Sequence, residues 1–158
     1  MYLPVNTEGV LTIAEGSSND AFGDISYLFP FDIDLDQAVI KRTCQAFRDR
    51  KETAVGIGFA VAAASALAAA MGDRKAATEL FRLSWQPYWL EPFGMIREVS
   101  SQTYGCFLTD YGAILQTAML GFTGIRVNES DWNKYDVTLP ENWKSIEVER
   151  IYVRGEQK

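Results

Sequence analysis

The first stretch with a helical pattern of hydrophobic and polar positions covers residues 32–51. Asp34 and Asp36 fall in its first turn and basic residues fall in its last turn, which is the order of charges that the helix dipole favours. Pro30 disfavours helix at the residue before it, so we expect residues 1–31 to be irregular and the helix to begin just after them. The candidate buried positions of this helix are Leu35, Val39, Ala46 and Phe47.

Residues 53–72 contain no charged side chain. Their number alone would allow a membrane-spanning helix. However, nearly half of them are alanine, which contributes little transfer energy, and basic residues flank the stretch on both sides. We therefore expect a helix that is apolar on every side because other helices bury it on every side, and we expect no membrane.

Gly72 and Asp73 predict a sharp boundary between two helices. Glycine suits the position just after a helix, where a left-handed backbone is common, and aspartate is a favoured N-cap. The second helix is predicted over residues 73–85, with inward positions at Ala77, Leu80, Phe81 and Trp85. The two helices should form a hairpin with a very short connection.

Residues 86–109 lose the helical period and contain two prolines and two glycines, including a Pro-Phe-Gly turn at residues 92–94. Long loops inside compact domains are usually functional or disordered. Disorder is disfavoured here by the aromatic residues Tyr88, Trp89, Phe93 and Tyr104. This segment is therefore the candidate functional loop.

A last helix is predicted over residues 110–122, with Asp110 as its N-cap. In the tail, residues 145–155 alternate apolar and polar side chains as a half-buried strand does, residues 137–139 are a second candidate strand, and residues 140–143 turn between them. The predicted fold is mainly α, with a short C-terminal β segment. The apolar positions of the last helix are Ile114, Leu115, Ala118, Met119 and Phe122.

Composition restricts the function more than the fold. The chain has 158 residues, about the size of one domain, and its net charge of −6 opposes binding to nucleic acid. It contains no histidine, which excludes histidine-based zinc sites and Ser-His or Cys-His nucleophile pairs within the chain. Cys44 and Cys106 match no metal or redox spacing, so we expect no metal and no cofactor. Any acid-base chemistry should fall to carboxylates. The first residues lack the pattern of a secretory signal, which predicts a cytoplasmic location.

Four segments of the chain resemble, in order and roughly in spacing, the C-terminal part of glycoside hydrolase family 65. The resemblance is to its glucosidase branch, which acts on kojibiose-like α-glucosides and glucosylgalactosyl units. It implies helical hairpins that form part of an (α/α)6 barrel, and a domain division into a helical part, residues 1–123, and a β segment, residues 124–158. The matching segments are AAAMGDRKAATELF, PYWLEPFGMIREVS, YGCFLTDYGAILQTAMLGFTGIRV and LPENWKSIEV.

The resemblance also implies a chemistry. The family inverts an α-glucosidic bond, and in its hydrolases a carboxylate activates water opposite the leaving group. That carboxylate closes a Pro-Phe-x-x-x-x-Glu segment, which here runs from Pro92 and Phe93 to Glu98. Glu98 is therefore the predicted general base, and a carboxylate at this place would repel phosphate and admit water. Trp89, Phe93 and Tyr104 are the predicted contacts to an α-glucoside, because aromatic faces suit the C–H groups of sugars.

The chain departs from the family in two respects. The family enzymes are several times longer and carry their general acid upstream of the matching region, and the chain offers no convincing second carboxylate for that role. Asp110 and Tyr111 stand where the family has small residues at the start of the last helix. The chain could therefore be one half of a split enzyme, a gene remnant or a reused helical fragment, and as an enzyme it should be inactive alone.

Plainer interpretations remain beside the enzymatic one. Glu98 could be a surface carboxylate near Arg97 or a helix N-terminus, and core packing is the commoner role for most of the aromatic residues Trp85, Tyr88, Trp89, Tyr104 and Phe107. Two functions stay open. The chain is either the base-bearing portion of an α-glucoside hydrolase or a non-catalytic helical module that binds a partner or itself. Its expected partner is a missing N-terminal half or a second copy.

Overall fold

The computed structural model describes residues 5, 7–9, 36–49, 58–127, 132–134, 136–150, 152–153 and 156–157. Most of the segment predicted to be irregular, residues 1–31, lies outside them. The helical elements are α1 (Gln37–Asp49), α2 (Gly58–Ala70), α3 (Arg74–Leu83), the 3-10 turn η2 (Gln86–Tyr88), α4 (Leu108–Gln116) and the π-helical turn η3 (Thr117–Gly121). The described part of the chain is therefore mainly helical, as predicted.

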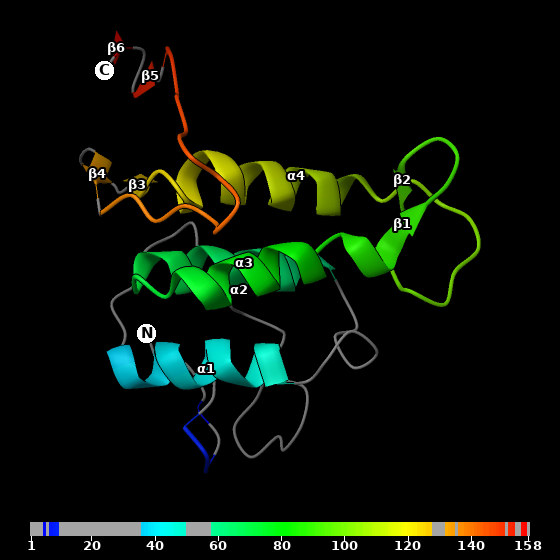
Figure 1. The fold of residues 1–158 in the computed structure, drawn as a ribbon, viewed down its shortest axis with the longest axis horizontal. Helices are drawn as coiled ribbons and strands as arrows, with labels where there is room; N and C mark the ends of the chain where they lie inside the picture. The colour runs from blue at the N-terminus through cyan, green and yellow to red at the C-terminus, as the bar shows by residue number, and fades with distance from the viewer. Residues whose placement is uncertain are drawn as a thin grey trace.

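The helices are stacked in three levels (Figure 1). α1 lies at one side, the α2–α3 hairpin lies in the middle, and α4 covers the other side. α2 contacts α1, α3, α4 and η3, so it is the central helix. The termini of the described chain lie away from the β1–β2 hairpin, which projects at the opposite end (Figure 1).

α2 is buried along almost its whole length, as its charge-free sequence predicted. Small side chains let the neighbouring elements come close: a Cβ on Gly121 would lie 2.7 Å from the Cβ of Ala66. Two buried hydroxyls tie the helix to its neighbours, because Ser65 Oγ donates to the Ala77 carbonyl and Thr117 Oγ1 donates to the Ala62 carbonyl, each at 2.8 Å. Among the described residues, no helix combines the length and the apolar character that crossing a membrane requires.

The predicted boundary between α2 and α3 is confirmed. Gly72 has the left-handed φ of 73°, and the Asp73 side chain accepts a hydrogen bond of 2.9 Å from the Ala76 amide. Ala77 and Leu80 are buried, whereas Trp85 lies beyond the end of α3. The short connection is therefore encoded by two local residues.

α1 begins later than the sequence pattern suggested. Asp36 stands just before the helix, and its side chain accepts from the Ala38 amide at 2.6 Å. Val39 is buried as predicted, together with Ile40 and Thr43. Leu35 and the side chain of Phe47 lie outside the described residues.

The segment predicted to be an irregular loop contains a small antiparallel hairpin. β1 (Trp89–Leu90) pairs with β2 (Met95–Ile96), and the Pro-Phe-Gly turn connects them with Gly94 at a φ of 64°. Each strand has only two residues, too few to show a period in the sequence. The sequence analysis predicted a loop with a turn here and did not predict the two strands.

The tail also differs from its prediction. The strands are β3 (Ile125–Val127) paired with β4 (Trp132–Lys134) and β5 (Tyr152–Val153) paired with β6 (Glu156–Gln157). Residues 137–139 and 145–150 form no strand, although Ile146 and Val148 are half-buried and alternate with exposed neighbours. Ile146 packs against the helical core, and the extended chain of residues 145–150 has no partner strand among the described residues.

The turn predicted at residues 140–143 is present, and ring contacts and hydrogen bonds connect it to α3. Trp143 packs edge-on against Phe81 and Phe122, with ring centroids 5.8 and 5.5 Å away. The Arg74 guanidinium donates to the carbonyls of Pro140 and Glu141 at 3.1 Å. The tail therefore covers the helical core near η3.

Candidate functional site

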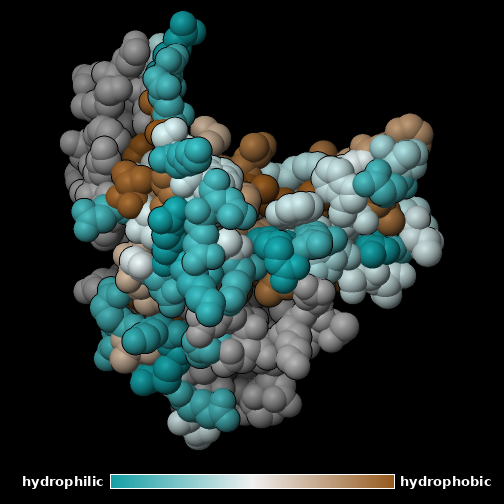
Figure 2. Space-filling model, viewed as in Figure 1, coloured by the Kyte–Doolittle hydropathy of each residue, from teal (hydrophilic) through white to brown (hydrophobic). Residues whose placement is uncertain are grey.

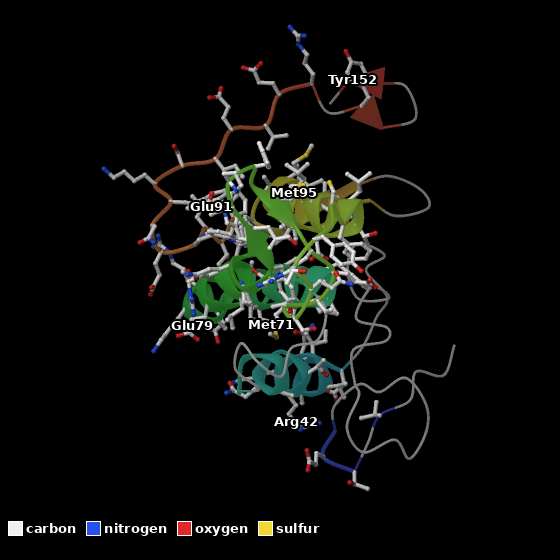
Figure 3. The ribbon with its side chains drawn as sticks, turned by 90° about the vertical axis from the view of Figure 1, so that its right-hand side faces the viewer. Arg42, Met71, Glu79, Glu91, Met95 and Tyr152 are labelled. Carbon is white, nitrogen blue, oxygen red and sulfur yellow. The ribbon has the colours of Figure 1, made fainter. Side chains whose placement is uncertain are left out.

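The β1–β2 hairpin is held against the helices by polar contacts to its backbone. The Tyr111 hydroxyl on α4 accepts from the Ile96 amide at 2.9 Å and donates to the Gly94 carbonyl at 2.8 Å. The Phe107 amide donates to the Ile96 carbonyl at 2.7 Å. Glu91 and Met95 mark the hairpin in the view along its end (Figure 3). These contacts fix the start of the segment that carries Glu98.

Arg97 fixes the next step of that segment. Its amide donates to the Tyr88 carbonyl at 3.0 Å, and its guanidinium donates to the carbonyls of Pro87 and Gln102. Its Nε is buried and has no hydrogen-bond partner. The Arg97 side chain is therefore bound to the loop backbone.

Glu98 itself is exposed, and its amide donates to Gln102 Oε1 at 3.2 Å. No ion pair to its carboxylate is formed within the described part of the chain. Glu91 is also exposed and accepts from the Trp89 indole N–H at 2.9 Å. Of the two acids around the turn, only Glu98 thus presents an unengaged carboxylate to water on a segment with a fixed backbone.

The aromatic residues of the loop fall into two groups. Tyr88 is fully buried and Phe107 is half-buried against Phe59, so core packing explains both. The three predicted sugar contacts are exposed: Trp89 by 41%, Tyr104 by 76% and Phe93 by 81%. Trp89 is also braced edge-on by Trp85 at 5.9 Å. The exposed group is available to a ligand, and its role stays a prediction.

Asp110 corrects the sequence analysis. It does not cap the last helix, because α4 begins at Leu108 with Phe107 at the N-cap position, and Asp110 lies inside the first turn. Its side chain is completely buried, with an exposed fraction of 0%. A Cβ on Gly58 would lie 2.4 Å from Asp110 Oδ2, so the carboxyl group approaches the first turn of α2 as closely as a glycine permits.

Burial raises the pKa of Asp110 to about 7, the Phe59 amide opposes this shift, and the negative charge of Glu98 adds to it. The Phe59 N–H stabilises the ionised form of the Asp110 carboxyl group. By strict distance and angle criteria, however, neither carboxyl oxygen has a hydrogen-bond partner. Burial, and then the charge of Asp110, raise the pKa of Tyr88 to about 12. Asp110 is thus a carboxyl group that changes charge near neutral pH.

One signal for the position of Asp110 was present in the sequence, and the capping interpretation missed it. The family that the chain resembles has small residues at the start of this helix, so an acid there was a departure from that pattern, and burying it requires a matching gap elsewhere. Gly58 supplies that gap from a segment about fifty positions earlier, which no local pattern reveals. Among the described residues, no group of three or more Cys, Asp or Glu side chains could hold a metal ion.

Comparison with known proteins gives a distant similarity. No protein-family model matches the chain. A kojibiose hydrolase of Mucilaginibacter mallensis is 27% identical over 126 residues, which cover 79% of this chain and 19% of that protein. A kojibiose hydrolase of Flavobacterium johnsoniae is 26% identical over 124 residues, covering 78% of this chain and 18% of that protein. The chain therefore spans about a fifth of the length of these relatives and is similar to a part of a glycoside hydrolase.

Proposed function

We propose that the chain is the base-bearing portion of an inverting α-glucoside hydrolase, with Glu98 as the general base. In this reaction Glu98 takes a proton from water while the water oxygen bonds to the anomeric carbon. The bond from that carbon to the leaving oxygen breaks, and the leaving oxygen takes a proton from a general acid. That acid belongs to a further portion of polypeptide. In the relatives, the part outside the matched segment makes up about four fifths of the length.

One observation carries the proposal: the similarity to the kojibiose hydrolases extends over more than three quarters of the chain, and within it the candidate base is exposed and unengaged. A general base must reach water and must not be neutralised by an ion pair. Trp89, Phe93 and Tyr104 would contact the sugar from the same loop. Their exposure supports this assignment, because side chains that stack on a ligand must be accessible in its absence.

The experiment supplies the missing portion. The chain is combined with the Flavobacterium johnsoniae kojibiose hydrolase from which the matching segment has been removed, and kojibiose hydrolysis is measured. We expect activity from the combination and none from this chain alone. Glu98→Gln should lower the rate by about 100-fold or more, the scale of a positioned base, whereas Glu91→Gln should change it little. Equal effects of the two substitutions, or a combination without activity, would reject the assignment.

A second candidate function is supported by one face of α4 and of η3, the turn that continues it. Leu108 and Leu115 on α4 and Met119 on η3 recur at helical spacing and are each more than half exposed. Gly112 lies between them, and a Cβ there would meet no atom within 4 Å. Hydrophobic atoms are visible over α4 in the space-filling view (Figure 2). Apolar faces of this kind are seldom left to solvent, and a non-catalytic module that pairs with a second copy through α4 would cover it.

Sedimentation tests whether the chain self-associates or remains a monomer. A two-fold dimer should be present at micromolar concentration, and Leu115→Glu should dissociate it because the charge would be buried in the interface. Lys144→Glu, a substitution to the same acid at an exposed tail position, is the control. A monomer for the unsubstituted chain rejects self-association through α4 and leaves the hydrolase proposal unaffected.

A further inference from the structure

The exposed side chain of Glu98 stands on a backbone that is held at two successive amides. The Arg97 amide donates to the Tyr88 carbonyl at 3.0 Å. The Glu98 amide donates to the side-chain oxygen Oε1 of Gln102 at 3.2 Å. The first of these acceptors belongs to the backbone of η2, whereas the second is a side chain of the same loop, four residues further along the chain.

Gln102 is itself held at both of its backbone groups. Its amide donates to the Val99 carbonyl at 3.1 Å, and its carbonyl accepts from the Arg97 guanidinium. The same guanidinium donates to the Pro87 carbonyl at 2.9 Å, which connects the turn to η2. The side chain of Gln102 therefore reaches back to Glu98 from a fixed origin.

The bond from the Glu98 amide to Gln102 is not needed to close this turn. The Arg97 guanidinium already joins the two ends of residues 97–102. The Glu98 amide lies at an exposed position, where water could accept its hydrogen bond with little change in stability. What the glutamine oxygen adds is a direction, because the peptide unit is planar and holding its N–H fixes the plane that ends at the Glu98 Cα.

We propose that Gln102 is a positioning residue for Glu98, whose side-chain oxygen fixes the peptide plane before Glu98 and so holds the carboxylate toward the water that it activates. This deepens the proposed function and rests on it for its catalytic meaning. Gln102 acts through the backbone and takes no proton itself. The effect on the rate follows because a general base must stay within hydrogen-bond reach of its proton, and a displacement of about 1 Å is costly.

The bond is tested in the chain as it exists, by hydrogen exchange at the Glu98 amide. Gln102→Met keeps the length of the side chain but removes the acceptor, so exchange at Glu98 should accelerate by about 10-fold. Gln102→Glu keeps an acceptor oxygen and should restore slow exchange. Gln86→Met is the matched control, because Gln86 Oε1 is an acceptor in the same loop but binds the Arg82 guanidinium at 2.6 Å. Exchange at Leu67 in α2 reports any loss of global stability.

The positioning role is tested by kinetics in the combination with the shortened Flavobacterium johnsoniae enzyme. Gln102→Met should lower kcat for kojibiose by about 10-fold and leave KM nearly unchanged, because the base is misdirected while the groups that contact the sugar remain. Gln86→Met should change neither constant. A bond that served only the stability of the loop would not separate kcat from KM in this way.

Two results would overturn the inference. Unchanged exchange at Glu98 in Gln102→Met would show that the glutamine oxygen does not hold this amide. Accelerated exchange with an unchanged kcat would show that the bond orders the loop without directing the base. An unsubstituted combination without activity would instead reject the proposed function, and with it the catalytic meaning of the bond. An active combination that is insensitive to Gln102→Met rejects the positioning role alone, so the two failures are distinguishable.

Discussion

The helical core around α2 and the loop from Gln86 to Phe107 are held by different interactions. The core consists of small and aliphatic side chains that bring helices into close contact, with a few buried hydroxyls bonded to backbone carbonyls. The loop buries Tyr88 and Ile96. The rest of it is held by Arg97 and Tyr111, which bind its backbone carbonyls and amides. This polar attachment leaves Trp89, Phe93, Tyr104 and Glu98 exposed to solvent.

The largest difference between the two regions should appear on truncation of a large apolar side chain. Leu80 is completely buried, and Leu80→Ala should lower the free energy of unfolding by about 2–5 kcal/mol because it leaves a cavity. Phe93→Ala removes a larger side chain from the loop, yet it should change stability by about 0.5 kcal/mol or less because Phe93 is exposed. Chemical denaturation measures both. Equal losses would mean that the loop is packed like the core.

The free energy of unfolding should depend on pH through Asp110, which lies where the core meets the loop. Its pKa is raised in the folded protein to about 7, so its contribution to stability is fully present below about pH 4 and is lost as the pH rises through 7. Between pH 4 and pH 8 the free energy of unfolding should therefore fall by about 2–4 kcal/mol more in the unsubstituted chain than in Asp110→Asn. Parallel pH profiles of the two proteins would contradict the raised pKa.

Removing the Tyr111 hydroxyl should remove the hydrogen bonds that hold the hairpin against α4. Tyr111→Phe leaves the Ile96 amide and the Gly94 carbonyl without their partner, at a cost of about 1–3 kcal/mol. Hydrogen exchange at Ile96 should accelerate strongly, while exchange at Leu67 in α2 should follow only the global loss. Tyr104→Phe, the same change at an exposed position, is the control. Unchanged exchange at Ile96 would show that the hairpin is held in another way.

Substitutions at two glycines of α4 and η3 should have opposite signs, and the gain at Gly112 should be the smallest effect. Gly121→Ala places a methyl group 2.7 Å from the Ala66 Cβ, which should cost about 1–3 kcal/mol by overpacking. Gly112→Ala meets no atom within 4 Å and should stabilise α4 by about 0.5–1 kcal/mol through its higher helix propensity. A gain at both positions would mean that η3 does not approach α2 closely. Thermal denaturation of the pair gives the sign directly.

Local signals account for the parts of the fold that were predicted well. Gly72 and Asp73 set the α2–α3 connection because a left-handed backbone and a side-chain cap involve only neighbouring residues. The charge-free sequence of α2 indicated burial on all sides because its composition admits no exposed face. The β1–β2 hairpin escaped prediction because two-residue strands carry no period. The strand predicted over residues 145–155 rested on an alternation of apolar and polar residues that is also present in residues 145–150, which form no strand.

The sequence by itself determined the helical class, the α2–α3 hairpin and the position of the aromatic loop that carries Glu98, because propensity, capping and composition act over a few residues. Only the tertiary structure decided the buried position of Asp110. A local sequence pattern assigns such an aspartate to a helix cap. The buried site that it occupies instead is created by Gly58 on another helix. Its charge depends on burial and on Glu98, and both arise only when α2, α4 and the loop are brought together. Long-range contacts of this kind leave no period or motif in the chain.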